Sequence, residues 1–164
     1  YIYLITRYRL STQIEDQSRA FLQGLTELIN PRWLRLFNTE ELRVLVTGAD
    51  TPIDVEDLRR NTVYGGYHEK DMAVQYFWEA LSLLDQASLK AFLRFVTSSP
   101  NPPLLGFSEL NPKFAIRHAG DDITRLPTAS TCVNLLKLPA YNSTAQCLEK
   151  LKYAIYSGAG FDLS

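Results

Sequence analysis

The chain has 164 residues, of which 46% are hydrophobic and 21% charged, so it is long enough for one ordinary core or for one domain with part of another. Its 17 basic and 18 acidic side chains give a net charge of -1, which provides no broad electrostatic attraction to nucleic acid or to an anionic membrane. No apolar run has the length of a membrane span, and the first residues lack the pattern of a signal peptide.

The first 48 residues are predicted to be mainly helical. Apolar residues recur at helical spacing in 1–10 and again in 13–29, where Asn30 and Pro31 end the pattern. Asn38 is predicted to cap the next helix, with Glu41 as its reciprocal partner. The sequence starts without a methionine inside what reads as an ordered segment, so we interpret it as a fragment of a longer protein.

A linker is predicted at residues 47–52, where a glycine, small polar residues and a proline occur together. A helix C-cap would by itself also account for Gly48. We place a domain boundary there, with one domain at 1–48 and a second at 49–164.

The second domain contains two patterns of amphipathic helices. One covers residues 71–84, and the other follows the capping residue Asp85 and continues to Val96. Aromatic residues at helical spacing are a packing face more often than a ligand site, so we interpret both stripes as core.

Short strands complete this domain, and they are predicted at 62–67, 114–117 and 133–138. A last helix follows Ser143, which forms the pattern of a capping box with Gln146. The expected fold class is therefore α+β, with a small β-sheet packed with helices after a mostly helical segment.

The run Leu104–Phe107 is unusually apolar for a region rich in serine and proline. It can fold back on the core or form a contact surface. We favour the core, because large exposed apolar patches are uncommon.

Cys132 is the candidate nucleophile. It follows a predicted loop that contains a proline and three hydroxyl side chains, namely Pro127, Thr128, Ser130 and Thr131. A buried and inert thiol is the alternative, since cysteine is among the most buried residue types. The polar loop and the nearby cation Arg125 favour an accessible thiolate at Cys132, whereas Cys147 lies beside an apolar helical stripe and is interpreted as core.

The two cysteines and two histidines fit neither a structural zinc spacing nor a disulfide framework. We therefore expect no metal and no cofactor, and we expect a reducing compartment, which is the cytoplasm, the nucleus or both.

Several motifs occur in a characteristic order along the chain: Asn61-Thr-Val-Tyr-Gly-Gly-Tyr67, Pro102-Pro-Leu-Leu-Gly-Phe107, Leu126-Pro-Thr-Ala-Ser-Thr-Cys132, Asn134-Leu-Leu-Lys-Leu-Pro139 and Gly160-Phe161. Together they resemble the C-terminal part of the HECT domain of E3 ubiquitin ligases, over the whole chain. The details look most like the proteasome-associated branch of the family that extends ubiquitin chains.

The resemblance implies that residues 1–48 are the closing helices of the family's N-lobe and that 49–164 are its whole C-lobe. It implies a flexible hinge at Gly48 and Ala49. Cys132 would accept ubiquitin as a thioester intermediate from an E2 ubiquitin-conjugating enzyme and transfer it to a lysine of a substrate or of another ubiquitin.

The partners implied in this way are ubiquitin, protein substrates, the proteasome, and an E2 that binds mainly through an N-lobe upstream of this sequence. The outcome would be polyubiquitination and proteasomal protein degradation.

Further roles follow from the same resemblance. Phe161 occupies the place of the phenylalanine that orients donor ubiquitin and acceptor in the family. Many members have histidine two residues before the cysteine, where this chain has Ser130. The residues themselves offer Asp162, or Asp121 and Asp122, as acceptors of the proton of the attacking amine if the chain folds them close to Cys132, although an Asp pair in a turn usually serves the turn alone.

Two other functions remain open from the residues. A cysteine hydrolase would pair Cys132 with His118. A non-catalytic ubiquitin- or protein-binding module would use Leu104–Phe107 and Phe161 as contacts and leave Cys132 inert.

Overall fold

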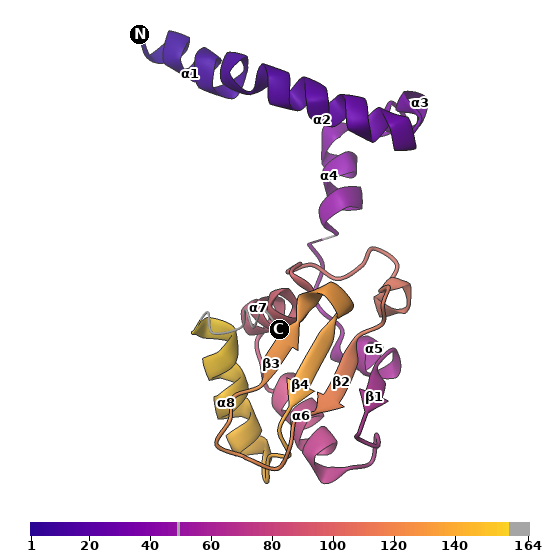
Figure 1. Ribbon diagram of the computed structural model, residues 1–164, viewed down its shortest axis with the longest axis vertical. Coiled ribbons are helices and arrows are strands. Elements are labelled where there is room, and N and C mark those ends of the chain that lie inside the picture. Colours follow the sequence, from indigo (N-terminus) through magenta and orange to yellow (C-terminus); the bar gives the residue numbers. More distant parts are fainter. Residues whose placement is uncertain (49, 158–164) are drawn as a thin grey trace. The chain divides into compact units, whose positions relative to one another are not determined.

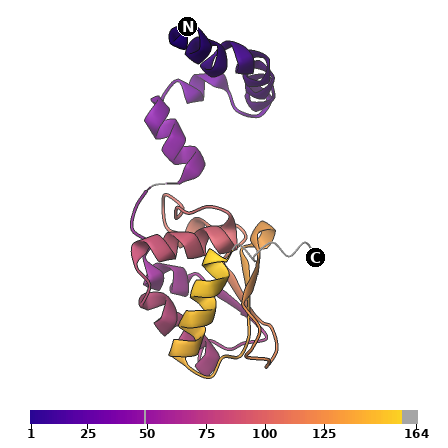
Figure 2. The same cartoon turned by 90° about the vertical axis from the view of Figure 1, so that its left-hand side faces the viewer.

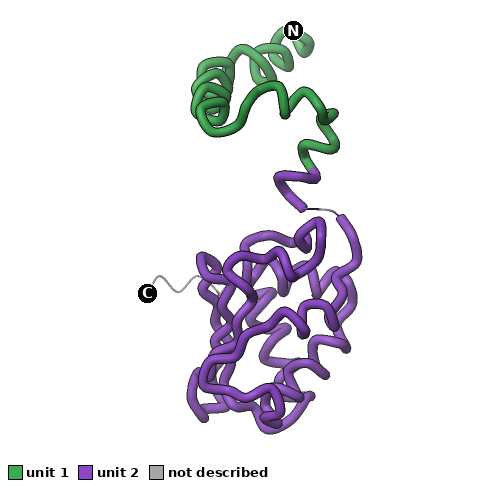
Figure 3. The backbone as a smooth tube through the Cα atoms, turned by 90° about the vertical axis from the view of Figure 1, so that its right-hand side faces the viewer, with its two compact units in different colours: residues 1–43 green, residues 44–164 purple. Residues whose placement is uncertain are grey.

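The computed structural model describes residues 1–48 and 50–157. The chain divides into two compact units, residues 1–43 and 44–164 (Figure 3). The division lies within helix α4 (Thr39–Thr47).

The first unit is helical, as predicted. Its elements are α1 (Ile2–Leu10), a short 3-10 turn (Thr12–Ile14), α2 (Glu15–Leu28) and α3 (Pro31–Leu34) (Figure 1). Asn30 follows α2 and caps α3, because its side chain accepts a hydrogen bond from the backbone N–H of Arg32. None of the described residues in this unit is buried.

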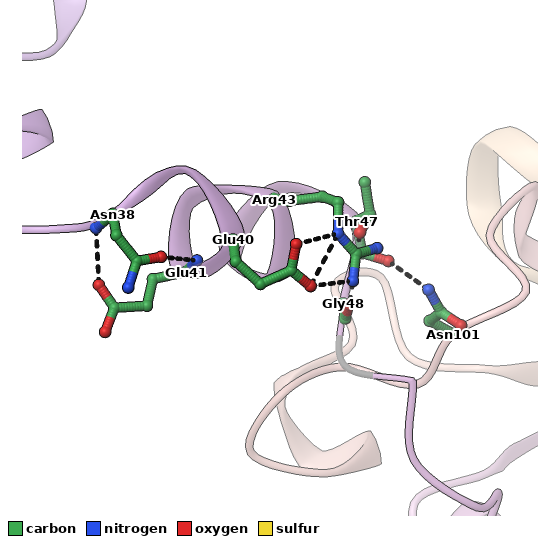
Figure 4. A network of polar contacts seen from close by, with 7 residues as sticks. All are labelled: Asn38, Glu40, Glu41, Arg43, Thr47, Gly48 and Asn101. Atoms are coloured by element: carbon green, nitrogen blue, oxygen red, sulfur yellow. Dashed lines mark hydrogen bonds and ion pairs between the residues drawn. The ribbon is translucent and has the colours of Figure 1, made fainter.

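The predicted capping box at the start of α4 is confirmed. The backbone N–H of Asn38 donates to Glu41 Oε2 at 2.7 Å, and the N–H of Glu41 donates to Asn38 Oδ1 at 2.9 Å (Figure 4). The helix start is therefore specified by residues three positions apart.

The second unit contains a four-stranded sheet in the order β1-β2-β4-β3. The strands are β1 (Val63–Gly65), β2 (Ala115–His118), β3 (Thr128–Ser130) and β4 (Leu135–Leu138). The pairs β1–β2 and β2–β4 are parallel, whereas β3 and β4 are antiparallel neighbours. The α+β class is confirmed, together with the three predicted strands.

The prediction of a loop before Cys132 is wrong for the central part of that segment, because Thr128–Ser130 is a strand. Thr128 pairs with Lys137 and Ser130 pairs with Leu135, and Ala129 between them turns into the core with 4% exposure. Hairpin pairing with β4 thus overrides the loop propensity of these small polar residues.

Helices cover one face of this sheet. They are α5 (Val55–Arg60), α6 (Met72–Ser82), α7 (Gln86–Thr97) and α8 (Thr144–Tyr156). Helix α7 contacts β3 and β4, and α8 packs on α6 and α7, so the helices gather on one side of the strands (Figures 1 and 2). Both predicted amphipathic helices are confirmed, and Asp85 caps α7 by accepting from the N–H of Ser88.

Aromatic rings form the centre of the core. Phe92 lies 6.0 Å from Phe77 and 6.0 Å from Phe114 between ring centroids, and all three side chains are at most 1% exposed. The stripes predicted to be core are therefore core.

The capping pattern at α8 forms with one difference. Ser143 Oγ accepts from the N–H of Gln146 as expected, but Gln146 Oε1 accepts from the N–H of Asn142 instead of Ser143. Ser143 itself has the extended geometry that is usual for an N-cap residue, with φ -160° and ψ 157°.

The run Leu104–Phe107 is divided between core and solvent. Phe107 is 2% exposed, as predicted, whereas Leu104 and Leu105 are 52% and 78% exposed, so the preference for the core is wrong for these two residues. Gly106 adopts a φ of +94° and turns the chain, and Phe107 is then held by a hydrogen bond from its N–H to Asp57 Oδ2.

Candidate functional site

Cys132 lies on a single 3-10 turn, Thr131–Val133, that joins β3 to β4. Its side chain is exposed, and so is that of its neighbour Val133. Helix α7 contacts the turn from the core side. The two antiparallel strands and this helix hold the backbone of the turn while the thiol remains open to solvent.

Asn134 anchors the turn, and the sequence analysis missed it as a functional candidate. It has left-handed backbone geometry with φ 50° and ψ 42°, and it is only 7% exposed. Its Nδ2 donates to the carbonyl of Pro112 at 2.6 Å, and its own carbonyl accepts from the N–H of Ala115 at 3.0 Å. An asparagine directly before an apolar strand was the available signal, since asparagine tolerates this geometry better than most residues.

The predicted supporting residues lie close to Cys132 in the hairpin. Pro127 is buried, and Thr128, Ser130 and Thr131 are half-buried. None of these three hydroxyls forms a hydrogen bond within residues 1–48 and 50–157. They are therefore available to orient a ligand bound at the turn.

Cys147 contrasts with Cys132. Its side chain in α8 has 0% exposure, and burial raises the pKa of this thiol to about 12. At neutral pH it remains a protonated core residue, as predicted.

The charged residues considered as neighbours of Cys132 lie at the opposite end of the sheet, so the structure does not bring them to the thiol: they are Arg125, Asp121 and Asp122. The N–H of Ala119 donates to Leu138 O, and the side chain of Arg125 donates to Ala119 O. The turn at residues 119–125 therefore adjoins the end of β4. Cys132 precedes the start of β4, and the strand between the two ends spans about 10 Å.

The two aspartates of this turn have local partners instead. Asp121 Oδ1 lies 3.3 Å from His118 Nε2. Asp122 accepts from the side chain and the backbone of Thr124, which lower the pKa of this carboxyl. Neither is placed to take a proton from an amine at Cys132.

The same register argues against a hydrolase pair of Cys132 and His118. His118 pairs with Leu138 at the far end of β4, and its ring packs edge-on against Tyr67 with centroids 4.8 Å apart. An imidazole in this position cannot act as a base for Cys132.

The predicted hinge residue Gly48 has a φ of +79° and lies against a loop of the second unit. A Cβ at this position would lie 2.7 Å from the carbonyl oxygen of Pro102, so only glycine fits. The preceding carbonyl, that of Thr47, accepts from Asn101 Nδ2 at 3.1 Å (Figure 4). Just beyond, Asp50 forms an ion pair with Lys90.

Three residues singled out from the sequence, Ala49, Phe161 and Asp162, lie outside the described residues. Within the described part of the chain, no group of three or more histidine, cysteine or acidic side chains is arranged to hold a metal ion. Nor does any helix in that part have the length and apolar character needed to cross a bilayer.

The fold and site define a class of protein: an α+β lobe that presents a single exposed cysteine on a hairpin turn and keeps its other thiol buried. Residues 1–164 match the HECT-domain (ubiquitin-transferase) family over their whole length. The chain belongs to this family.

Curated relatives agree with this assignment. The chain is 49% identical over 164 residues to the E3 ubiquitin-protein ligase HUL5 of Saccharomyces cerevisiae, covering all of the chain and 18% of that protein. It is 45% identical over 170 residues to the E3 ubiquitin-protein ligase UPL6 of Arabidopsis thaliana, covering all of the chain and 16% of that protein. It is 40% identical over 190 residues to human ubiquitin-protein ligase E3B, covering all of the chain and 18% of that protein. The chain thus spans less than a fifth of the length of these relatives.

Proposed function

We propose that the chain is the catalytic end of an E3 ubiquitin ligase in which Cys132 carries ubiquitin as a thioester. The observation that carries the proposal is the contrast between the two thiols: Cys132 is exposed on a braced turn, and Cys147 is fully buried. Membership of the HECT family and the ubiquitin-ligase names of the relatives support the same chemistry.

In the first step the Cys132 thiolate attacks the carbonyl carbon of the thioester that joins the C-terminus of ubiquitin to an E2 cysteine. The tetrahedral intermediate collapses and expels the E2 thiolate. One thioester is exchanged for another, so the step is close to balanced in free energy and requires no redox partner. The Cys132 side chain is exposed, as an exchange with a thioester on another protein requires.

In the second step a neutral lysine amine attacks the Cys132 thioester, an amide forms, and the Cys132 thiolate leaves. The amine must lose a proton, because a lysine with an ordinary pKa of about 10.4 is almost wholly protonated at neutral pH. With Ser130 two residues before Cys132, no imidazole is offered there. We propose Asp162 as the proton acceptor and Phe161 as the residue that orients donor and acceptor.

The hydroxyls of Thr128, Ser130 and Thr131 can help to position the thioester, since they have no partner within the described residues. We further propose that residues 1–48 close an N-lobe and 49–164 form the C-lobe, with a hinge at Gly48 and Ala49. The close contact of Gly48 with Pro102 would set one end of that hinge.

The proposed partners are ubiquitin, an E2 bound mainly by an N-lobe, and protein substrates. We propose that the reaction extends ubiquitin chains toward proteasomal degradation, which adds the proteasome as a partner. A reducing cytoplasmic or nuclear compartment suits a free catalytic thiol.

The test is a thioester assay on HUL5 in which this chain replaces the matching segment. The chimera is incubated with activating enzyme, a charged E2 and ubiquitin, and analysed on a non-reducing gel. We expect an adduct that a reductant removes, lost with Cys132→Ala and retained with Cys147→Ala.

Unmodified HUL5 provides the positive control, and alkylation of Cys132 reports that the turn has formed in the chimera. A chimera with a reactive Cys132 but no adduct would contradict the transferase proposal. It would favour the binding module that the sequence left open.

A further inference from the structure

The face of the sheet opposite the helices lacks a covering helix in the described part of the chain. Inward residues of the strands, such as Ile116 and Leu136, have 0% exposure, and their neighbours in the strands point the other way. These outward residues are partly or fully exposed along all four strands. Figures 1 and 2 show the helices on one side of the strands.

The strand register arranges the outward residues in two rows. An apolar row crosses the sheet at the end near the Cys132 turn, where Val63 pairs with Ala115 and Ala115 pairs with Leu135. Val63 is 48% exposed, and the other two are half-buried. This row provides a shallow apolar strip at the same end of the sheet as the Cys132 turn.

A basic row follows, two residues further along the strands. Arg117 pairs with Lys137 in the register of β2 and β4, so two cations lie on directly adjacent strands. Their outer neighbours in the row are Gly65 and Thr128, which carry no charge. We call Arg117 and Lys137 the basic row.

The basic row has no counter-ion in the described part of the chain. Neither Arg117 nor Lys137 forms an ion pair or a side-chain hydrogen bond there. Like charges directly opposite each other weaken a sheet, so the pair does not contribute to the stability of the fold. The arrangement is one that an anionic partner would complete.

We propose that this open face binds the acceptor: an extended acidic segment of the protein that receives the acyl group from Cys132. The inference rests on the proposed transfer function and specifies the chemical class of its substrate. One carboxylate of the segment lies between the two cations of the basic row, and an apolar side chain lies on Leu135 and Val63. The target lysine then reaches the thioester at the turn.

The spacing of the rows defines the motif. Successive rows are two residues apart along the strands, and an extended ligand repeats at the same interval of about 3.3 Å per residue. An acidic residue on the basic row therefore places an apolar residue two positions away and a lysine two positions beyond that. We expect the pattern lysine, any residue, apolar, any residue, acidic.

Charge also distinguishes this partner from a polyanion. The chain as a whole has a net charge of -1, so a long phosphate backbone meets no extended basic surface. Two cations beside an apolar strip match a short acidic-apolar peptide instead.

The test measures fluorescence anisotropy of two labelled peptides with the 164-residue chain. One is Gly-Lys-Ser-Leu-Ser-Glu-Ser-Gly, and the matched peptide has Gln in place of Glu. At low salt we expect the acidic peptide to bind about tenfold more tightly, as two exposed ion pairs allow. Arg117→Ala with Lys137→Ala removes this preference.

Two further variants serve as controls. Arg117→Lys with Lys137→Arg keeps both charges and retains the preference, which shows that the loss does not come from misfolding. Lys70→Ala with Lys152→Ala removes two exposed cations elsewhere and leaves binding unchanged. If Lys70→Ala with Lys152→Ala removed the preference for the acidic peptide as fully as Arg117→Ala with Lys137→Ala, the basic row would not be the binding site.

The same peptides are measured with Cys132→Ala, because binding on the open face does not require the thiol. If the parent binds the acidic peptide selectively but forms no thioester with ubiquitin, the binding surface stands and its role as an acceptor site is overturned. Normal thioester formation with equal binding of both peptides would overturn the surface alone. Tighter binding of an oligouridylate, lost in the Arg117→Ala and Lys137→Ala variant, would overturn the choice of an acidic peptide.

Discussion

The two units of the chain use apolar side chains in opposite ways. In the α+β unit Phe77 has 0% exposure and packs within a cluster of aromatic rings. In the helical unit Phe21 is 68% exposed and Trp33 is 62% exposed, although α2 carries an apolar stripe as regular as that of α6. The same helical pattern therefore leads to a core in one unit and to an uncovered face in the other.

Helix formation and stability therefore have different sources in this chain. Periodicity and caps are enough to define α2 and α4, but little free energy is gained by a helix whose apolar face stays in water. The α+β unit gains its stability from contacts between elements far apart in sequence. Substitutions matched between the two units should reveal this difference.

The largest effect is expected from removing a phenyl ring in each unit. Phe77→Ala should lower the free energy of unfolding by about 3–5 kcal/mol, because it leaves a cavity in the core. Phe21→Ala should change it by no more than about 0.5 kcal/mol. Urea unfolding followed by tryptophan fluorescence measures both, and similar losses would show that the stripe on α2 is covered.

The next effect compares two asparagines. Asn134→Ala should cost about 2–3 kcal/mol, since alanine resists left-handed geometry and the Pro112 carbonyl loses its donor. Asn134→Gly should recover about 1 kcal/mol of this, because it restores only the backbone freedom. Asn38→Ala should cost about 1 kcal/mol, confined to helix α4.

Urea unfolding gives the costs at Asn134, and the rate of Cys132 alkylation reports whether the turn has moved. Helicity by circular dichroism follows Asn38→Ala. If Asn134→Ala leaves both stability and alkylation unchanged, Asn134 does not anchor the turn.

Two glycines are expected to respond with opposite signs. Gly48→Ala should destabilise the docked linker by about 1–2 kcal/mol, because it combines a positive φ with a clash against Pro102 O. Gly24→Ala should stabilise α2 by about 0.5–1 kcal/mol, since nothing lies within 4 Å of the added methyl group.

Limited proteolysis between residues 44 and 52 measures the first change, and circular dichroism measures the second. Unchanged cleavage in Gly48→Ala would mean that the contact with Pro102 is dispensable.

The last effect is absent at neutral pH and appears only in alkali, as a loss of stability of the α+β unit. Burial raises the pKa of Cys147 to about 12, whereas in the unfolded chain a cysteine titrates near 8.5. The unfolded state therefore loses this proton first, so the contribution is fully present below about pH 8.5 and is lost as pH rises toward 12. Burial also raises the pKa of Tyr67 to about 12 and raises that of Tyr141, which extends the loss above about pH 10.

We expect the free energy of unfolding to fall by about 1 kcal/mol per pH unit between pH 9 and 10 on account of Cys147. Cys147→Ala should flatten the slope in this interval. Urea unfolding at a series of pH values measures the slope, and an unchanged slope in Cys147→Ala would contradict the assignment.

Prediction from sequence succeeded where structure depends on near neighbours. Short-range patterns indicated the positions of helices α1, α2, α4, α6, α7 and α8, of the caps at Asn38 and Asp85, and of strands β2 and β4. The buried Cys147 was also anticipated, because it sits beside a regular apolar stripe.

Prediction failed where the register of the sheet decides the outcome. Arg125, Asp121 and Asp122 are close to Cys132 in sequence, but β3 runs the length of the sheet between them. Asn134 was not singled out, because its partner Pro112 lies 22 residues away. Leu104 and Leu105 were expected inside, but the turn at Gly106 admits only Phe107 to the core.

The sequence by itself determined most of the helices, the caps formed by Asn38 and Asp85, and the buried position of Cys147 beside an apolar helical stripe. These features depend on backbone preferences and on residues a few positions apart, which the order of the chain specifies directly. Only the tertiary structure decided which residues share the Cys132 end of the sheet and which share the open face. Strand pairing joins segments that are far apart along the chain, and a shift of the register by one residue would turn every side chain of a strand to the opposite face.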